Sequence, residues 1–182
     1  LNAISAESLE GALRIKKIVS DLRTFSKQSE SAVNLVDINQ ILESTLSIVW
    51  NEIKFKIAVV KDYQAKTQIF ADSTQLSQVF LNLLINASQA IPEKGTVTMS
   101  TSEDDNNIYI KISDTGPGIA PGVLPKIFDP FFSTKKTGSG LGLSVSYNII
   151  KSHQGQIKAE STVGKGTTFT ISLPKKEEPQ RR

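Results

Sequence analysis

Cysteine is absent from this sequence of 182 residues, and histidine occurs once, at position 153. Without cysteine the chain cannot form a disulfide, a thiol nucleophile or a cysteine-ligated zinc site, and one histidine excludes a histidine-rich metal centre. Long hydrophobic runs are also lacking, and the amino-terminal residues do not have the pattern of a secretory signal. We therefore expect a soluble, cytoplasmic segment that makes no contact with a membrane.

Net charge is also small. The formal net charge is +3, and the last eight residues, KKEEPQRR, contribute +2 of it. The rest of the chain is close to neutral, which argues against a basic surface for nucleic acid. With 38% hydrophobic and 21% charged residues, the composition is that of one globular domain with an appendage.

The spacing of apolar residues divides the chain into three parts. In residues 1–30, apolar side chains recur at alternating steps of three and four, which predicts one long helix with a coiled-coil or bundle seam. Such a helix needs a partner helix, from an upstream segment or from a second subunit. A polar linker, KQSESAVN, leads into a globular domain over residues 31–174, and residues 175–182 are expected to be a disordered tail.

Strand and helix patterns alternate in the globular part. Helices are expected over residues 38–54, in a segment that carries two asparagines, and over about 141–152, with Asp37 and Ser73 as N-caps of the first two. Because most of the strand-like segments have one apolar face, the expected fold is α/β, a two-layer sandwich with helices on one face of a sheet. The expected strands lie in VNLVDI, IAVVKDY, TQIFAD, GTVTMSTSE, NIYIKISD, GQIKAES and GTTFTISLP.

The two-asparagine segment is SQVFLNLLINASQAI, residues 77–91. Asn82 and Asn86 are four residues apart, so on a helix they share one face, opposite the apolar stripe. Burying an amide without hydrogen-bond partners costs about 1 to 3 kcal/mol, so we expect the two asparagines to have polar partners and a common role. The helix alone leaves two interpretations open: a polar network between helices, or amide oxygens that face a ligand or a hard cation such as Mg²⁺.

Glycine concentrates in the loop that follows NIYIKISD. Six of the eleven glycines lie between Gly116 and Gly142, where they let the backbone approach a ligand and present successive N–H groups. A helix that starts near Leu141 adds its positive end, so phosphate is the natural occupant. The spacing is not that of a Walker loop, which needs a lysine in place. It is not that of a dinucleotide-binding loop either, because Leu143 stands where the third glycine belongs.

Four motifs occur in order along the chain: NLLINA, DTGPGI, IFDPFFSTK and TGSGLGL. Together they closely resemble the asparagine, first glycine, phenylalanine and second glycine boxes of the sensor histidine kinase catalytic domain, in the superfamily shared with gyrase, MutL and the heat-shock chaperone ATPases. The resemblance covers residues from about 35 to 174, and RIKKIVSDLRTFS resembles the second helix of the dimerisation and phosphotransfer domain. It implies the GHKL (Bergerat) fold, a mixed sheet packed on helices and preceded by a long bundle helix.

The resemblance implies that ATP and Mg²⁺ bind here. Asp114 would accept a hydrogen bond from the adenine amino group and, as an acceptor only, would reject guanine. Asn86 would ligate Mg²⁺, Asn82 would lie near the phosphates, and Thr167 would help to hold the base through water. The other implied contacts of the nucleotide are Gln89, Gly116, Gly118, Ile119, Thr134, Lys135, Thr137, Gly138, Ser139, Gly140, Leu141, Gly142 and Leu143.

The same resemblance implies a nucleotide lid over residues 120–139. Within it, Phe131 and Phe132 would be packing anchors for the lid or contacts to a neighbouring helical domain, rather than partners that stack on the base. Thr134 and Lys135 would meet the phosphates, and the backbone N–H groups of residues 138–142 would cradle them.

Asn82 stands where gyrase-type and chaperone relatives have the glutamate that activates water. An amide cannot take that proton, so the site is expected to pass the γ-phosphoryl group of ATP to a protein acceptor rather than to water. The family's phosphorylated histidine lies on the first phosphotransfer helix, outside this sequence. Because His153 is expected to be structural, at a helix end, we expect a fragment that cannot phosphorylate itself.

The expected function is the ATP-binding catalytic part of a two-component sensor histidine kinase. Its partners would be its own phosphotransfer domain, a second subunit in a homodimer, and the receiver domain of a response regulator. Two alternatives remain. One is a Ser/Thr kinase of the anti-sigma type, against which the bundle-type helix argues. The other is a non-catalytic module in which ATP closes the lid and so controls docking.

Overall fold

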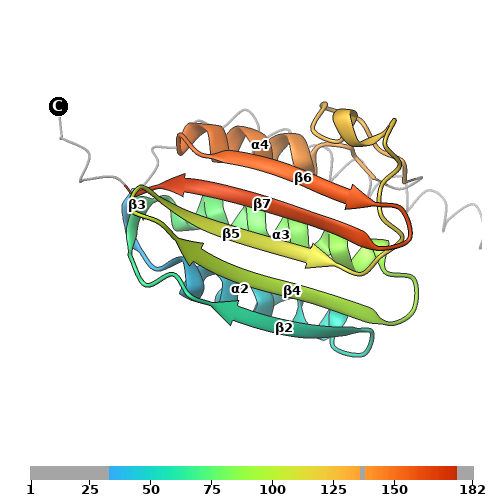
Figure 1. Cartoon of the computed structure of the whole chain (residues 1–182), viewed down its shortest axis with the longest axis horizontal. Coiled ribbons are helices and arrows are strands. Elements are labelled where there is room, and N and C mark those ends of the chain that lie inside the picture. The colour runs from blue at the N-terminus through green and yellow to red at the C-terminus, as the bar shows by residue number, and fades with distance from the viewer. Residues whose placement is uncertain (1–32, 136–137, 176–182) are drawn as a thin grey trace, which may run out of the picture.

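Three α-helices cover one face of a five-stranded sheet in the computed structural model, which describes residues 33–135 and 138–175 (Figure 1). The strand order is β2-β4-β5-β7-β6, with β2 parallel to β4 and the other neighbouring pairs antiparallel. This arrangement confirms the expected α/β two-layer fold with a mixed sheet. The elements are β2 (Ile57–Tyr63), β4 (Gly95–Glu103), β5 (Asn107–Asp114), β6 (Gln156–Thr162), β7 (Gly166–Pro174), α2 (Ile38–Ile53), α3 (Ser73–Ala90) and α4 (Gly142–Ser152).

A separate two-stranded sheet joins the segments that precede α2 and α3. It pairs β1 (Asn34–Val36) antiparallel with β3 (Ile69–Ala71). The helix predicted over residues 1–30, Thr137 and the tail from residue 176 lie outside the described residues. None of the helices in the described ranges combines the length and the apolar character that crossing a membrane requires.

Aspartates cap the first two helices. Asp37 caps α2 as expected, and its Oδ1 accepts hydrogen bonds from the backbone N–H groups of Asn39 and Gln40. The prediction that Ser73 caps the next helix is wrong. Asp72 has the extended backbone of an N-cap and its carboxylate accepts from two N–H groups of the first turn, so Ser73 becomes the first helical residue.

The pleat of β5 sets the position of Asp114. Ile108, Ile110 and Ile112 alternate along the strand and are buried against the helices, with 0 to 2% of their surface exposed. Asp114 is two residues further along, so its side chain points to the same helix-covered side. The strand therefore places a carboxyl group at the end of the core rather than on the open face of the sheet.

Helix α3 divides into two faces. Its buried side includes Leu76, Phe80 and Leu83, whereas Asn82 and Asn86 are only half-buried. The apolar stripe packs in the core between α2, α4 and the sheet, as its helical spacing predicts. The two amides are thereby held at the edge of the core.

The only histidine of the sequence joins α4 to α3. The backbone N–H of Asp72 donates to Nε2 of His153 over 3.1 Å, and Nδ1 of His153 lies 2.8 Å from the backbone oxygen of Ile149. Because Nε2 accepts, Nδ1 must carry the proton and donate to Ile149. These two backbone contacts fit the structural role expected for His153.

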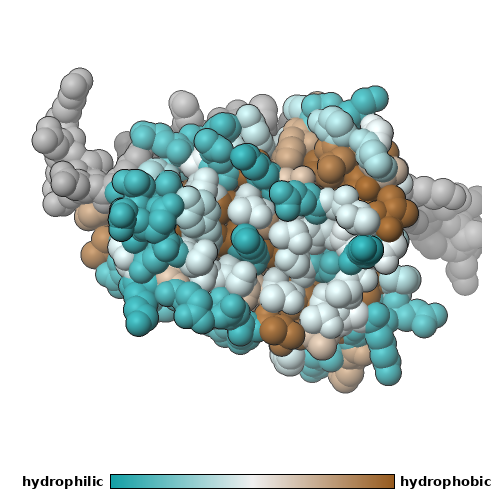
Figure 2. Space-filling model, in the orientation of Figure 1, coloured by the Kyte–Doolittle hydropathy of each residue, from teal (hydrophilic) through white to brown (hydrophobic). Residues whose placement is uncertain are grey.

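The face of the sheet that lacks helices is polar. It is nearest the viewer in Figure 1, and it is mostly pale or teal in Figure 2, which shows the same orientation. Outward positions of the strands are occupied by hydroxyl-bearing or charged residues, because the inward positions hold the apolar ones. Examples are Thr98, Ser100, Tyr109, Lys111, Thr168, Thr170 and Ser172.

Candidate functional site

One end of the sandwich gathers most of the polar residues singled out in the sequence. The end of α3, the end of β5, the start of α4 and the β6–β7 hairpin all lie there (Figure 1). The long loop between β5 and α4, which contains the short 3-10 helix η1 (Leu124–Lys126), lies at the same end. The candidate site is therefore assembled from five elements and one loop.

Asp114 is the buried acid of this end. The residue is 8% exposed, and its Oδ1 accepts a hydrogen bond of 2.8 Å from the backbone N–H of Gly116. Burial raises the pKa of Asp114 above its ordinary value, while the N–H groups of Gly116 and Thr167 and the charge of Lys135 oppose that rise. The result is a desolvated carboxyl group that can accept a hydrogen bond from a ligand.

The first glycines of the loop leave room next to this carboxyl group. A Cβ on Gly116 would lie 2.8 Å from Oδ1 of Asp114 and 3.2 Å from Cβ of Ala90, so a side chain would fill the space between β5 and α3. Gly118 has a φ of +74°, and a Cβ there would overlap the backbone oxygen of Thr162. Glycine thus lets the loop turn and pack directly on the β6–β7 hairpin.

Ser161, which the sequence reasoning did not single out, fastens this loop to the sheet. Its Oγ accepts a hydrogen bond of 2.7 Å from the N–H of Ile119 and lies 2.9 Å from Oγ1 of Thr167. Ser161 also donates to the backbone oxygen of Gly166 over 2.9 Å. The signal that could have identified it is its register, because it follows Ile157 and Ala159 on the inward face of β6.

A cavity of about 270 Å³ opens beside these residues. It is bordered by Asp114, by residues 160–162 of β6 and by residues 165–168 around the start of β7. Thr167, whose partner across the sheet is Asp114, is 5% exposed. A buried carboxyl and a buried hydroxyl group therefore lie next to each other at the edge of an open hollow.

Asn82 connects α3 with the start of α4. Its Nδ2 donates to the backbone oxygen of Gly142 over 3.1 Å and to Oγ of Ser146 over 3.3 Å. In this structure Asn82 therefore makes a polar contact between α3 and α4. For Asn82, this agrees with the first of the two interpretations left open by the sequence, a polar network between helices. The N-cap of α4, Leu141, has no side-chain capping bond, and a helix start of this kind favours an anion.

Asn86 and Gln89 meet a cation. The Nζ of Lys135 donates to Oδ1 of Asn86 over 3.2 Å and to Oε1 of Gln89 over 2.7 Å. Within the described ranges no group of three or more His, Cys, Asp or Glu side chains could hold a metal ion. Two amide oxygens that already face an ammonium ion fit Mg²⁺, which prefers oxygen and is often held by few protein groups together with phosphates.

The rest of the predicted contacts follow the loop into α4. Thr134 is exposed, Gly138, Ser139, Gly140 and Leu143 are half-buried, and Leu141 is buried. The Oγ of Ser139 accepts a long hydrogen bond of 3.4 Å from the N–H of Leu141. Gly140 packs against the backbone of Phe131. Thr137 lies outside the described residues, so its place relative to these groups stays a prediction.

Phe128, rather than Phe131, packs the loop onto the domain. Its ring centroid is 5.7 Å from that of Tyr147 and 6.5 Å from that of Phe169. Phe131 is 66% exposed, so the first of the two roles expected for it, a packing anchor of the lid, is wrong, and the second, a contact to a neighbouring helical domain, stays a prediction. Phe132 is half-buried. The motif IFDPFFSTK therefore packs its first phenylalanine against the core.

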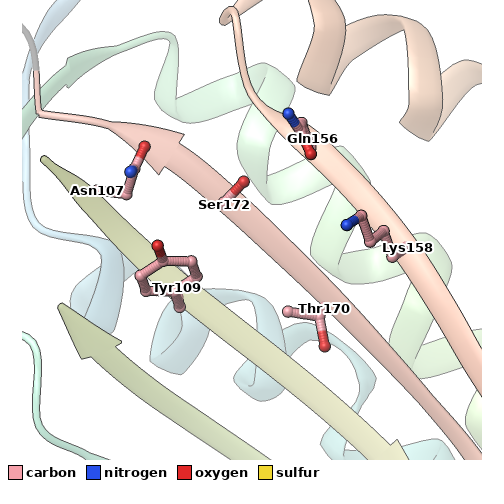
Figure 3. Close-up of a pocket in the computed structure, with 6 residues that line it drawn as sticks. All are labelled: Asn107, Tyr109, Gln156, Lys158, Thr170 and Ser172. Carbon is pink, nitrogen blue, oxygen red and sulfur yellow. The ribbon is translucent and has the colours of Figure 1, made fainter. Parts of the chain in front are cut away.

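A second hollow, of about 330 Å³, lies on the open face of the sheet and differs from the first (Figure 3). Side chains from β5, β6 and β7 surround it, and none of them carries a carboxylate. Neither the glycine loop nor a helix start borders it, so we place the candidate site at the Asp114 end. The residues that line the second hollow are Asn107, Tyr109, Gln156, Lys158, Thr170 and Ser172.

Most of the chain is similar to known proteins. Residues 71–177 match the family described as histidine kinase-, DNA gyrase B- and HSP90-like ATPases. The sensor histidine kinase ZraS of Escherichia coli (strain K12) is 38% identical over 163 residues, which cover 88% of this chain and 35% of that protein. The chain therefore spans about a third of the length of this relative.

Solved structures of histidine kinases have the same fold. The catalytic domain of histidine kinase ThkA matches with a TM-score of 0.72 and 29% identity, over 79% of this chain and 95% of that one. ThkA in complex with the response regulator protein TrrA matches with a TM-score of 0.77 and 26% identity, over 96% of this chain and 50% of the matched one.

Proposed function

Because the chain belongs to the family of histidine kinase-, DNA gyrase B- and HSP90-like ATPases, we propose that it is the ATP-binding catalytic part of a sensor histidine kinase. It holds ATP so that the γ-phosphoryl group passes to a histidine of a phosphotransfer domain and then to an aspartate of a response regulator. The observation that carries this proposal is the buried carboxyl group of Asp114, next to Thr167 and beside a cavity.

Asp114 and Thr167 hold the base in this proposal. A carboxylate only accepts hydrogen bonds, so Asp114 favours the amino group of adenine over the carbonyl oxygen of guanine. The hydroxyl group of Thr167 is fixed by Ser161 at 2.9 Å. Gly116, Gly118 and Ile119 let the base and the ribose approach, because the loop packs on β6 without side chains at the two glycines.

The start of α4 holds the phosphates. Residues 138–142 lead into this helix, whose first N–H groups and positive end attract an anion. Asn82 lies against Gly142, where a Cβ would be 3.6 Å from Cγ of Asn82. Thr134 and Lys135 complete the phosphate contacts from the loop, so the charge of the triphosphate is met by dipoles and by one ammonium group.

Asn86 holds the metal in this proposal. When bound with the nucleotide, Mg²⁺ supplies neutralisation of phosphate charge. The amide of Asn86 supplies one oxygen ligand, and its place on the half-buried side of α3 keeps that oxygen near the loop. Phosphoryl transfer depends mostly on such positioning and charge neutralisation, which suits a site that has no general base at Asn82.

The function can be tested by adding a separate phosphotransfer polypeptide. With Mg·ATP labelled on the γ-phosphate, the label is expected to move to a histidine of the added polypeptide and to be lost in acid. A polypeptide in which that histidine is replaced by glutamine serves as the control. Acid-stable label on serine or threonine would support the anti-sigma type of kinase instead, and no transfer despite ATP binding would favour the non-catalytic module.

Two partners follow from the proposal. The solved complex of ThkA with TrrA supports a response regulator as the acceptor domain. The apolar seam predicted over residues 1–30 supports a helical partner in a phosphotransfer domain or a second subunit of a homodimer.

Asn86→Ala is expected to weaken the binding of Mg·ADP about tenfold, because one oxygen ligand of the metal is lost. Binding of ADP in excess EDTA is expected to change less than about twofold, since that complex does not use the ligand. Isothermal titration calorimetry measures both affinities, and Asn148→Ala, an exposed position on α4, is the matched control. Equal losses with and without the metal would contradict the assignment of Asn86.

A further inference from the structure

The ammonium group of Lys135 contacts the amide oxygen of Asn86, which the proposed metal site would use, and also that of the neighbouring Gln89. Its Nζ lies 3.2 Å from Oδ1 of Asn86 and 2.7 Å from Oε1 of Gln89. The amides are three residues apart on α3, so they lie on one helix face and can hold one cation between them. Lysine can only donate, so each amide must present its oxygen rather than its nitrogen to the ammonium group.

This contact joins two segments that are far apart in the sequence. Lys135 comes from the loop between β5 and α4, and its partners lie 46 and 49 residues earlier on α3. The charge of Lys135 also reaches the Asp114 carboxyl group, whose pKa it lowers against the effect of burial. The ammonium group therefore bonds to the amides and also acts electrostatically on Asp114, the acid that contacts adenine in the proposed function.

We infer that Lys135 and the metal of the bound nucleotide compete for Asn86. In the ligand-free protein the ammonium group holds the amide oxygens of Asn86 and Gln89, and it leaves them when the metal-bearing nucleotide binds. This inference rests on the proposed function and adds a role for Gln89. Gln89, expected from the sequence among the nucleotide contacts, stabilises the ligand-free arrangement instead.

The chemistry of the two cations explains the exchange. An ammonium ion and a hard divalent ion both seek oxygen, and Oδ1 of Asn86 cannot meet both at the same position. Lysine has three donors on a long flexible stem, so the group that leaves the amides can turn to phosphate oxygens. The exchange keeps a positive charge beside Asn86 in both states. Lys135 therefore contacts the oxygen of Asn86 in the ligand-free protein, and the metal contacts it after the nucleotide binds.

The first test measures the ligand-free state by the reactivity of lysine side chains. With acetic anhydride at limiting concentration, Lys135 is expected to be acetylated about two- to fivefold more slowly than Lys111, an exposed lysine on the open face of the sheet. Gln89→Leu is expected to remove most of this protection. Gln156→Leu, an exposed position on β6, is the matched control and should leave it unchanged. Tandem mass spectrometry resolves the individual lysines.

The second test measures nucleotide affinity in the same variants. Because Gln89→Leu weakens the competitor, Mg·ADP is expected to bind about two- to fivefold more tightly, with no gain for ADP in excess EDTA. Calorimetry on the full chain measures both. Weaker binding of Mg·ADP to Gln89→Leu would show that Gln89 contacts the bound nucleotide or its metal, and would overturn the exchange. Equal acetylation of Lys135 and Lys111 in the ligand-free protein would also overturn it.

The outcomes separate the exchange from the function itself. If the protein binds no ATP or ADP, the proposed function fails, while protection of Lys135 by Gln89 is still measured without nucleotide. If nucleotide binds with magnesium but Lys135 is unprotected in the ligand-free protein, only the exchange fails.

Discussion

Asp114→Asn is expected to weaken ATP binding about 10- to 100-fold. A hydrogen bond to a charged group contributes about 1.5 to 3 kcal/mol, and asparagine replaces part of the acceptor with an amino group that faces the amino group of adenine. Calorimetry with Mg·ATP measures the loss. Asp105→Asn, in the exposed hairpin between β4 and β5, is the matched control and should bind ATP like the original protein. Unchanged affinity in Asp114→Asn would refute the assignment of the base site.

The same substitution is expected to stabilise the fold at neutral pH. Burial raises the pKa of Asp114 above its ordinary value of 3.8, so the folded protein binds this proton more tightly than the unfolded chain does. The carboxyl group therefore favours folding fully below the ordinary pKa, and this contribution is lost as the pH rises through the raised value. Asparagine has no charge to bury. Urea unfolding should show a more stable Asp114→Asn at pH 7 than the original protein, with the difference shrinking towards pH 4.

This pairing of effects distinguishes a lost contact from a damaged fold. A variant that binds ATP poorly because it is unfolded would also unfold at lower urea concentration. Weaker ATP binding together with greater stability at pH 7 would show that the contact between Asp114 and adenine is lost. Weaker binding together with lower stability would indicate that the hydrogen bond from Gly116 to Asp114 holds the loop.

Gly166→Ala is expected to lower the free energy of unfolding by about 3 kcal/mol or more. Gly166 has a φ of +115°, and a Cβ there would overlap the backbone oxygen of Asp114. The left-handed backbone costs an L residue about 1 to 2 kcal/mol, and forced overlap in a packed region adds about 1 to 3 kcal/mol. The overlap cannot relax easily, because β5 and β7 are paired at Asp114 and Thr167. Urea denaturation measures the change, and ATP affinity should fall with it.

Two other glycines provide graded controls for this prediction. Gly164 has a φ of +80°, but a Cβ there would meet no atom within 4 Å, so Gly164→Ala should cost only about 1 to 2 kcal/mol. Gly122 has open space and no such φ, so Gly122→Ala should change stability by less than about 0.5 kcal/mol. Equal destabilisation at Gly164 and Gly166 would show that the backbone conformation, rather than the overlap with Asp114, determines the cost.

Much of the sheet could be predicted because its strands alternate cleanly. The segments GTVTMSTSE, NIYIKISD and GTTFTISLP are the observed β4, β5 and β7 from end to end. Each has one apolar face against the helices and one polar face against solvent, which is the pattern that periodicity detects best. The shorter β3 occupies only three residues of the six in TQIFAD, because pairing with the three-residue β1 limits it.

The wrong predictions concern the N-cap of α3 and the phenylalanine that packs the loop. Two adjacent residues suited the N-cap equally well, and contacts with distant residues determine which phenylalanine packs. Asp72 and Ser73 are adjacent and both suit an N-cap, so only the backbone conformation distinguishes them. Three phenylalanines occur within five residues of IFDPFFSTK, and the partner rings of Phe128 come from α4 and β7, far along the chain. Such long-range packing leaves no local signal.

The candidate site was predicted in its parts rather than in its assembly. The family resemblance of the motifs singled out Asp114, Asn82 and Asn86, whose contacts with a nucleotide stay a prediction. The motifs could not show that Asn82 bonds to the start of α4 or that Lys135 reaches Asn86. Those contacts depend on the path of a glycine-rich loop, and glycine restricts that path least of all residues.

The register of β5 limits how this sequence can change in length. Asp114 shares the inward side with Ile108, Ile110 and Ile112, so a single residue inserted after Ile112 would turn the carboxyl group to the open face. An insertion among residues 104–106, in the hairpin before the strand, would leave the downstream register intact. We therefore expect evolution to tolerate insertions and deletions in that hairpin and to eliminate them in the strand, even where both variants fold.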